Sequence, residues 1–187
     1  MMKYRMSTRT PNRVLGIDPG FDRLGVAVLE KGGPSTGLGA SKETIVFSTC
    51  ITTDRKAEPA ERLRQIGTEL AAIILKYSPD ALAIEKLFFN QNVTTALKVA
   101  EARGVVLYEA AKAGLSINEY SPQDVKIAVT GYGKAAKGDV ERMVGVLIKL
   151  PLLSKGEKRL DDELDAIALG ITHFAHAASR ALSTRGK

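Results

Sequence analysis

Three short segments near the start of the chain have the hydrophobic pattern of β-strands. Residues 13–18 form an apolar run that ends at Asp-Pro-Gly, and residues 24–30 and 43–51 are two further strand candidates. Residues 31–42 are rich in Gly, Ser and Pro, which indicates a hairpin loop of unusual length. Because no helical pattern separates these segments, we expect an antiparallel meander.

The hydrophobic period then changes to that of helices. Apolar side chains recur every three or four residues from Leu63 to Tyr77, which predicts an amphipathic helix over 59–77. The apolar run 81–84, which ends at Glu85, predicts a central strand covered on both faces. The remaining pattern predicts a helix over 93–113 between Asn92 and Gly114, a strand over 116–120, a helix opened by Ser121-Pro122, and helices over 135–150 and 161–182. This order predicts an α/β protein with a five-stranded mixed sheet and helices on both faces.

One face of the helix predicted over 93–113 carries small residues. Ala96, Ala100 and Gly104 recur at four-residue spacing, so they line up along the helix. Small side chains allow the backbone to approach either the sheet or a second helix closely. The spacing leaves both partners open.

Length and composition indicate a single globular domain rather than several domains. The 187 residues suit one domain, which we expect over 13–182, with a flexible basic arm at 1–12 and a flexible tail at 183–187. The single cysteine excludes an intrachain disulfide and a cysteine-based zinc site. No apolar run approaches the roughly 18–20 residues that span a bilayer, and no hydrophobic leader follows the N-terminal basic residues. We therefore expect a soluble cytoplasmic protein with no membrane partner.

The basic charge of the chain is compatible with two explanations. The formal net charge is +6, and Lys and Arg cluster near both ends and within 126–137 and 149–159. Such clusters are typical of a surface that binds a polyanion such as nucleic acid. They are equally typical of a solvated surface with a loose tail, so charge alone does not choose between them.

Four carboxylates stand out by their positions in the predicted elements. Asp18 ends the first strand and Glu85 ends the fourth, where a buried carboxylate is costly unless it is paired or binds a metal. Asp162 and Asp165 are three residues apart at the start of the last helix and share a face, but so do Asp161 and Asp165. Helix geometry therefore does not choose between Asp161 and Asp162. For Asp161 and Glu163 a simple contact with the helix dipole is the favoured explanation.

If the fold brings Asp18, Glu85, Asp162 and Asp165 together, their mutual repulsion calls for cations. Hard oxygen ligands select Mg²⁺ or Mn²⁺, and two such ions about 4 Å apart can activate a water and stabilise the leaving oxygen of a phosphodiester. The sequence therefore predicts a site for two metal ions and metal-assisted hydrolysis.

Other motifs carry less chemistry. The segment Gly131-Tyr132-Gly133-Lys134 is not a phosphate-binding loop, because no strand leads into it and no Ser or Thr follows the lysine. His173 and His176 are three residues apart but have no further ligands nearby, so we expect ordinary helix residues. Cys50 is expected to lie within a strand.

An ordered set of motifs resembles the RuvC-type Holliday junction resolvases over about residues 13–176. Gly16-Ile17-Asp18-Pro19-Gly20 looks like the family's opening motif, and residues 83–92 (AIEKLFFNQN) look like its second acidic segment. Residues 162–168 (DELDAIA) with Thr172-His173 close the match. Between them, residues 96–98, 102–105, 120–122, 125–126 and 131–133 follow in the family's order.

The resemblance implies a ribonuclease H-like fold, a homodimer, and symmetrical nicking of four-way DNA junctions in recombination and repair, alongside a branch-migration motor complex. It aligns Asp162 and Asp165, rather than Asp161, with the family's paired acids. It also matches Lys126 and Lys137 to lysines near the DNA backbone, and Phe88 to an aromatic residue that engages the junction. Phe88 and the adjacent Phe89 are unusual in a polar loop, and an exposed ring can stack on an unpaired base; alternatively, both rings anchor the loop.

Three other functions are compatible with parts of the pattern. A related ribonuclease H-like nuclease could act on another nucleic acid, and products from junction, duplex and RNA–DNA hybrid would separate the two. A non-catalytic module could bind junctions and recruit a motor, although four clustered carboxylates hinder DNA binding unless a metal is used. An ATP-binding fold of the sugar-kinase type would require a second, duplicated domain, for which this chain is too short.

Overall fold

The computed structural model describes residues 12–32, 43–87, 93–152 and 159–185. The strands are β1 (Arg13–Asp18), β2 (Arg23–Glu30), β3 (Thr44–Thr52), β4 (Ala81–Glu85) and β5 (Ser116–Tyr120). The helices are α1 (Pro59–Tyr77), α2 (Val93–Lys112), α3 (Pro122–Thr130), α4 (Lys137–Leu147) and α5 (Asp161–Arg185). The predicted elements are all present, in the predicted order.

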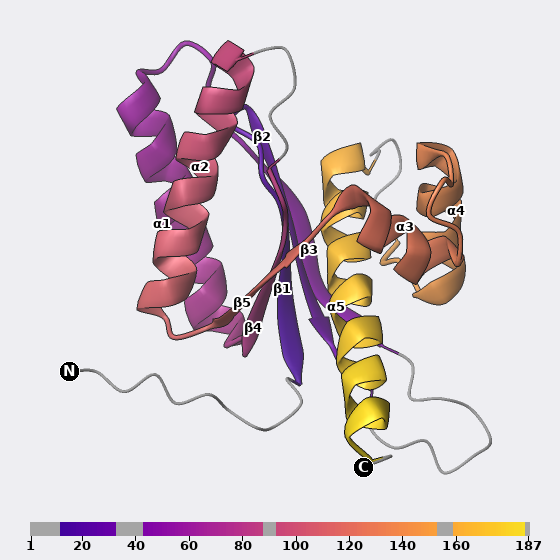
Figure 1. Ribbon diagram of the computed structural model, residues 1–187. Helices are drawn as coiled ribbons and strands as arrows, with labels where there is room; N and C mark the ends of the chain where they lie inside the picture. The colour runs from indigo at the N-terminus through magenta and orange to yellow at the C-terminus, as the bar shows by residue number, and fades with distance from the viewer. Residues whose placement is uncertain (1–11, 33–42, 88–92, 153–158, 186–187) are drawn as a thin grey trace.

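The five strands form one mixed sheet in the order β3-β2-β1-β4-β5 (Figure 1). β1, β2 and β3 pair antiparallel, which confirms the meander. β4 pairs parallel with β1, and β5 pairs parallel with β4. β4 therefore lies inside the sheet, and its residues 81–84 are buried as the continuous apolar run predicts.

Helices cover both faces of the sheet and enclose two hydrophobic cores. α1 and α2 pack on one face, where Ile66 and Leu70 of α1 and Val106 of α2 meet sheet residues such as Ile17 and Ile84. α5 lies on the other face, with α3 and α4 outside it (Figure 1). In the described part of the chain, no helix is both long and apolar enough to cross a membrane.

α5 lies so close to the sheet that two strand positions have room for glycine alone. A Cβ atom on Gly16 of β1 would lie 2.1 Å from the carbonyl oxygen of Ala166, and one on Gly25 of β2 would lie 1.8 Å from that of Asp162. Both distances are far below any van der Waals contact. The backbone of α5 thus rests directly on β1 and β2, and its first turns are fixed over the end of β1.

Most element ends lie within one residue of the predictions, and three differences affect the extent of the domain or a helix. Asn12, expected in the flexible arm, donates its amide to the Asp80 carboxylate at 2.9 Å, so the ordered domain starts one residue earlier. α4 is shorter than predicted at both ends: Ile148 is extended and buried in the core, and Pro151 disfavours helical backbone before it. α5 continues to Arg185, so residues 183–185, expected in the tail, are helical.

Several predictions fall on residues outside the described ranges. These are most of the basic arm at 1–12, most of the loop 31–42, Phe88, Phe89, the Asn92 cap, and residues 186–187 of the tail. The cap predicted at Ser121 is described and is a full capping box: Ser121 Oγ accepts from the Asp124 amide, and the Asp124 side chain accepts from the Ser121 amide.

We expect Gly25→Ala to destabilise the protein severely, by about 3 kcal/mol or more, because a methyl group cannot fit against the Asp162 carbonyl. Gly145→Ala in α4 is the matched control, since a Cβ there meets only Leu150 Cδ1 at 3.9 Å. The control should gain about 0.5–1 kcal/mol from reduced backbone entropy. Urea unfolding of both variants measures the difference, and equal stabilities would contradict the close contact.

Candidate active site

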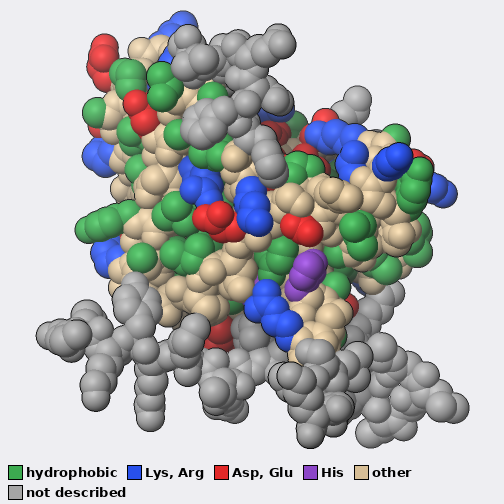
Figure 2. Space-filling view, viewed as in Figure 1, with side chains coloured by type: hydrophobic (Ala, Val, Ile, Leu, Met, Phe, Trp, Pro, Cys, Tyr) green, Lys and Arg blue, Asp and Glu red, His purple; other side chains and the backbone are tan. Residues whose placement is uncertain are grey.

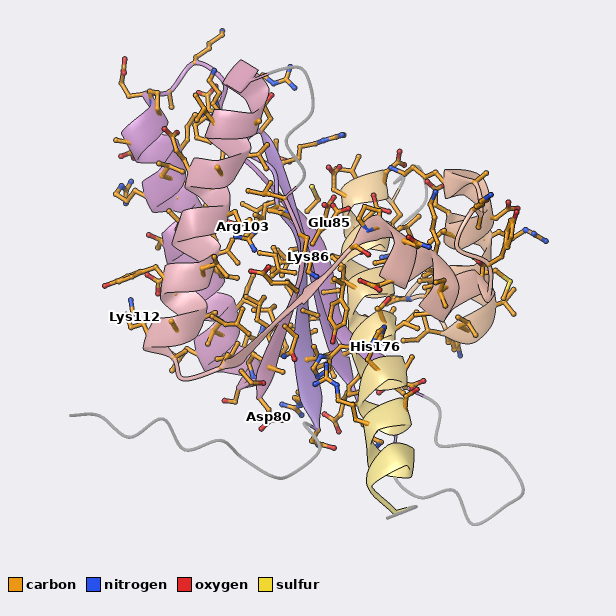
Figure 3. The ribbon with its side chains drawn as sticks, in the orientation of Figure 1. Asp80, Glu85, Lys86, Arg103, Lys112 and His176 are labelled. Atoms are coloured by element: carbon orange, nitrogen blue, oxygen red, sulfur yellow. The ribbon has the colours of Figure 1, made fainter. Side chains whose placement is uncertain are left out.

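Asp18 and Glu85 lie side by side at one edge of the sheet. β1 and β4 are parallel neighbours in which Ile17 pairs with Ile84. The residues that follow, Asp18 and Glu85, are the last of their strands and therefore lie next to each other. Figure 3 shows Glu85 at the end of β4, between the α2 and α5 sides of the molecule, with Lys86 next to it. The strand topology alone therefore brings these two carboxylates together.

The first turns of α5 add Asp162 and Asp165 to this edge. Gly25 is the residue that pairs with Asp18 across β1 and β2, and the Asp162 carbonyl rests on Gly25. Asp165 follows one helical turn later, next to Ala166, whose carbonyl rests on Gly16. The close packing of α5 thus places both aspartates beside Asp18.

Burial and neighbouring negative charges raise the pKa values of Asp18, Glu85 and Asp165. Burial, then the charges of Asp165, Glu85 and Asp162, raise the pKa of Asp18 to about 7. Burial and the charge of Asp165 also raise the pKa of Glu85. Burial likewise raises the pKa of Asp165, although Lys137 opposes this shift. An uncompensated cluster of this kind destabilises its own charged form.

Two basic side chains partly compensate the cluster. Lys137 Nζ, at the start of α4, lies 3.2 Å from Asp165 Oδ2 and 3.6 Å from Asp161 Oδ2. Partial burial lowers the pKa of Lys137, but the hydrogen bond and charge of Asp165 outweigh it and hold that pKa above its usual value. Arg23 Nε, at the start of β2, lies 3.1 Å from Asp162 Oδ2. Sequence reasoning missed Arg23, although it stands only five residues after Asp18.

The donor set fits a hard divalent cation. All four side chains offer carboxylate oxygens, which are the ligands that such ions prefer. Asp162 Oδ2 is buried and accepts no hydrogen bond, although it forms an ion pair with Arg23. Among the described residues, however, no three Asp, Glu, His or Cys side chains converge closely enough to hold an ion as they stand. Asp165 faces Lys137 and Asp162 faces Arg23, so we expect these carboxylates to rotate away from their basic partners on binding.

The structure distinguishes Asp162 from Asp161. The side chain of Asp162 is 19% exposed and contributes to the field at Asp18, whereas that of Asp161 is 65% exposed and does not. Glu163 is buried and bound elsewhere: it accepts a hydrogen bond from Ser48 Oγ and pairs with Arg159. The α5 carboxylates beside Asp18 are therefore Asp162 and Asp165.

The remaining predicted residues lie apart from this cluster. Lys126 is half-buried on α3, and no described contact joins it to the carboxylates. His173 is buried in α5, where its Nδ1 lies 3.0 Å from the Tyr120 hydroxyl, and burial lowers its pKa to about 4. It is an ordinary core histidine, as expected. Acidic and basic side chains stand next to one another on the face seen in Figure 2, so this face is not uniformly basic.

We expect Asp18→Asn to stabilise the protein at high pH when a chelator removes divalent cations. The pKa of Asp18 is raised from 3.8 to about 7, so wild-type stability falls as pH rises through that range, and the amide escapes this loss. The variant should gain about 1–4 kcal/mol over wild type between pH 4 and pH 8. Urea unfolding at both pH values measures this gain. Asp161→Asn, an exposed neighbour, is the control, and a similar gain there would contradict the assignment to Asp18.

Comparison with known proteins identifies a family. The family model described as "Crossover junction endodeoxyribonuclease RuvC" matches residues 14–173. Proteins of that name from Halothermothrix orenii and Heliobacterium modesticaldum are each 42% identical to this chain, over 92% of its length and 99% of theirs.

Solved structures agree with this result. Thermus thermophilus RuvC superposes with a TM-score of 0.78 at 33% identity, covering 90% of this chain and 96% of that chain. A second structure of the same protein, in complex with a Holliday junction substrate, gives a TM-score of 0.78 at 32% identity and the same coverage. These matches confirm the ribonuclease H-like fold. The chain therefore belongs to the RuvC family of crossover junction endodeoxyribonucleases, a family of metal-dependent nucleases.

Proposed function

We propose that this protein is a metal-dependent endonuclease that resolves Holliday junctions by cutting phosphodiester bonds in DNA. The observation that carries the proposal is the clustering of half-buried carboxylates from β1, β4 and α5, which raises the pKa of Asp18, in a chain of the RuvC family. The solved relative in complex with a Holliday junction substrate supports the choice of substrate.

We assign Asp18, Glu85, Asp162 and Asp165 as ligands of two Mg²⁺ or Mn²⁺ ions. When bound, such ions lower the pKa of a water and offset negative charge on phosphate oxygens. The carboxylates would position the ions. Two of them also form ion pairs with basic side chains, Asp162 with Arg23 and Asp165 with Lys137. With a cation bound at Asp165, the ammonium group of Lys137 would be free to donate to a phosphate oxygen.

Further DNA contacts follow from the family resemblance. We propose that Lys126 and Lys137 contact the phosphate backbone, which supplies sequence-independent, salt-sensitive affinity. We assign Phe88 to stacking at the opened junction and Phe89 to the same loop, although both lie outside the described residues. Action in the cytoplasm, in complex with a branch-migration motor, also remains a proposal.

We propose that α2 forms the interface of a homodimer. Along its outer side, Leu97 and Tyr108 are 56% and 64% exposed, and no atom lies within 4 Å of a Cβ placed on Gly104. The small residues Ala96, Ala100 and Gly104 could pack against the sheet or against a second helix. Because the Gly104 position is open, a second helix is favoured. A two-fold dimer presents two sites to strands of like polarity, as symmetrical nicking requires.

We expect wild type to nick a labelled four-way junction in paired, symmetrical positions when Mg²⁺ or Mn²⁺ is present. Asp18→Asn and Asp162→Asn should bind the junction but lose about 10³-fold or more in cleavage rate, because each removes a charged ligand. Asp161→Asn, the adjacent exposed carboxylate, should cut at close to the wild-type rate. Gel analysis of products from junction, duplex and RNA–DNA hybrid checks the result.

Two outcomes would refute the assignment. Tight junction binding without nicks under either ion would leave a junction-binding protein rather than a nuclease. Cleavage of an RNA–DNA hybrid in preference to the junction would instead favour a related ribonuclease H-like enzyme.

We expect Gly104→Leu to convert the dimer to a monomer without unfolding it, because the added side chain is accommodated within one subunit but not between two helices. Gly138→Leu on α4, whose Cβ position is equally open, is the control. Light scattering after gel filtration measures the molar mass, and circular dichroism checks the fold. A Gly104→Leu protein that keeps the wild-type mass would place the interface elsewhere.

A further inference from the structure

A cleft of about 370 Å³ opens beside the carboxylate cluster. Residues 20–23, Arg55, Lys98, Val99 and Asp162 line it. Asp162 is thus shared between the cleft and the carboxylate cluster. The other lining residues come from the turn between β1 and β2, the first residue of β2, the loop between β3 and α1, and α2. The cleft therefore continues the active site away from α4 and Lys137.

Three cationic side chains line this cleft. Arg23 pairs with Asp162 at 3.1 Å, and Arg55 pairs with Asp22 at 2.9 Å. Lys98 Nζ lies 5.9 Å from the centre of the ring of Phe21, the residue before Asp22 in the turn between β1 and β2. The side chain of Arg55 is 76% exposed, so most of its guanidinium donors point to solvent.

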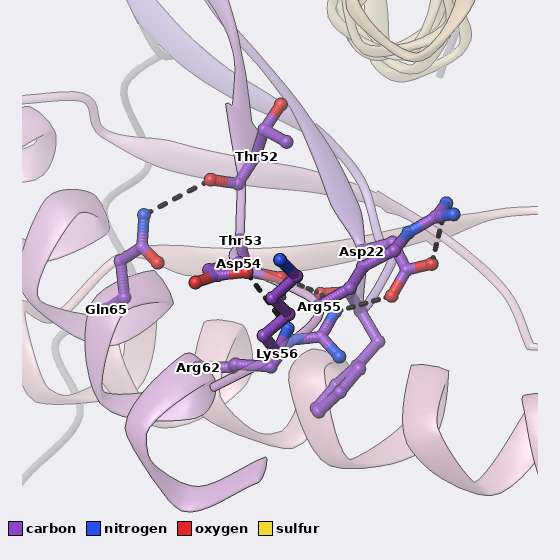
Figure 4. Close-up of polar contacts among 9 residues, drawn as sticks. Asp22, Thr52, Thr53, Asp54, Arg55, Lys56, Arg62 and Gln65 are labelled. Carbon is purple, nitrogen blue, oxygen red and sulfur yellow. Dashed lines mark hydrogen bonds and ion pairs between the residues drawn. The ribbon is translucent and has the colours of Figure 1, made fainter. Parts of the chain in front are cut away.

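A fourth cation, the buried Arg62 of α1, lies next to the cleft and holds the turn that carries Asp22 (Figure 4). Its guanidinium donates to Thr53 Oγ1 at 2.9 Å, to the Phe21 carbonyl at 3.2 Å and to the Asp22 carboxylate, and stacks 4.0 Å from the centre of the Phe21 ring. Thr53 also binds the turn, through its Oγ1 to the Phe21 carbonyl and its amide to the Asp22 carbonyl. These bonds hold the turn, and with it Asp22, in one place.

The side chains that line the cleft carry a small excess of positive charge. The Arg62 hydrogen bond, followed by the charges of Arg55, Arg62 and Lys98, holds the pKa of Asp22 below its usual value, so Asp22 stays ionised and anchors Arg55. The lining residues include three cations, Arg23, Arg55 and Lys98, and two carboxylates, those of Asp22 and Asp162. When a metal ion neutralises Asp162, Arg23 loses its counter-ion, and the excess increases.

We propose that this cleft binds the sugar–phosphate backbone of the DNA strand next to the scissile phosphate, with Arg55 and Lys98 contacting phosphates and Arg23 joining them as Asp162 is neutralised. The inference rests on the proposed function and adds a second phosphate-binding wall, opposite Lys137. Guanidinium and ammonium groups on a fixed frame suit backbone phosphates, since such contacts set the position of the duplex without selecting sequence.

The test measures junction binding without cleavage. A fluorescent four-way junction is titrated with full-length protein in EDTA at several KCl concentrations, and the slope of log affinity against log salt is determined. Arg55→Gln and Lys98→Gln should each weaken binding by about 3–10-fold and reduce the slope by about 1, because each removes one phosphate contact. Arg64→Gln, an exposed arginine of α1 that pairs with Glu61, is the matched control and should change neither value.

A methylphosphonate at single positions near the cleavage site locates the contact. The methylphosphonate replaces one charged phosphate by an uncharged group. At the phosphate that Arg55 binds, this replacement should lower the junction affinity of wild type but not that of Arg55→Gln, because both changes remove the same interaction. Equal melting temperatures of the variants exclude unfolding as the cause.

The outcomes separate this inference from the proposed function. If wild type binds and cuts junctions while Arg55→Gln and Lys98→Gln keep the wild-type affinity and slope, the cleft does not bind the backbone, and the nuclease assignment stands. If wild type neither binds nor cuts junctions, both proposals fail.

Discussion

The site depends on the direct contact between the backbone of α5 and two strands of the sheet. Gly16 and Gly25 let the Ala166 and Asp162 carbonyls rest on β1 and β2, where any Cβ atom would overlap them. In return, Gly170 of α5 leaves room for the side chain of Leu29, which fills the space a Cβ would need. Because Gly25 is the residue paired with Asp18, this contact fixes the distance between the strand carboxylates and the helix carboxylates.

The same contact creates an electrostatic conflict. Four carboxylates are held together where water is partly excluded, so the pKa of Asp18 rises to about 7 and those of Glu85 and Asp165 also rise. Lys137 and Arg23 offset part of the repulsion from opposite sides. The folded chain thus spends stability on a charge cluster that a divalent cation would relieve, once Asp162 and Asp165 rotate away from Arg23 and Lys137.

The segment from Asp18 to Arg23 connects the carboxylate cluster to the cleft that we propose binds DNA. It begins with a carboxylate of the cluster, passes through a turn held by the buried Arg62, and ends with the arginine that faces Asp162. A change of charge at Asp162 therefore acts on Arg23 directly. The charge of the carboxylate cluster and the basic side chains of the cleft are therefore coupled through the ion pair of Arg23 with Asp162.

The periodic pattern of the chain was sufficient to predict the sheet, the order of its elements and the buried central strand, because these depend on local alternation and on runs of apolar residues. Asp18 and Glu85 could be singled out for the same reason, since a carboxylate that ends a buried strand is visible in sequence. Spacing alone could not choose between Asp161 and Asp162, because both share a helix face with Asp165.

Only the packing of α5 on Gly25 distinguishes these two aspartates in space, and only the tertiary fold reveals the pairs of Arg23 with Asp162 and of Arg55 with Asp22. The buried role of Arg62 was equally hidden, as it occupies one position in an ordinary amphipathic helix. The sequence by itself determined which elements form and which carboxylates end them. The tertiary structure decided which charges meet, because ion pairs between distant segments depend on the approach of whole elements and leave no periodic trace in the chain.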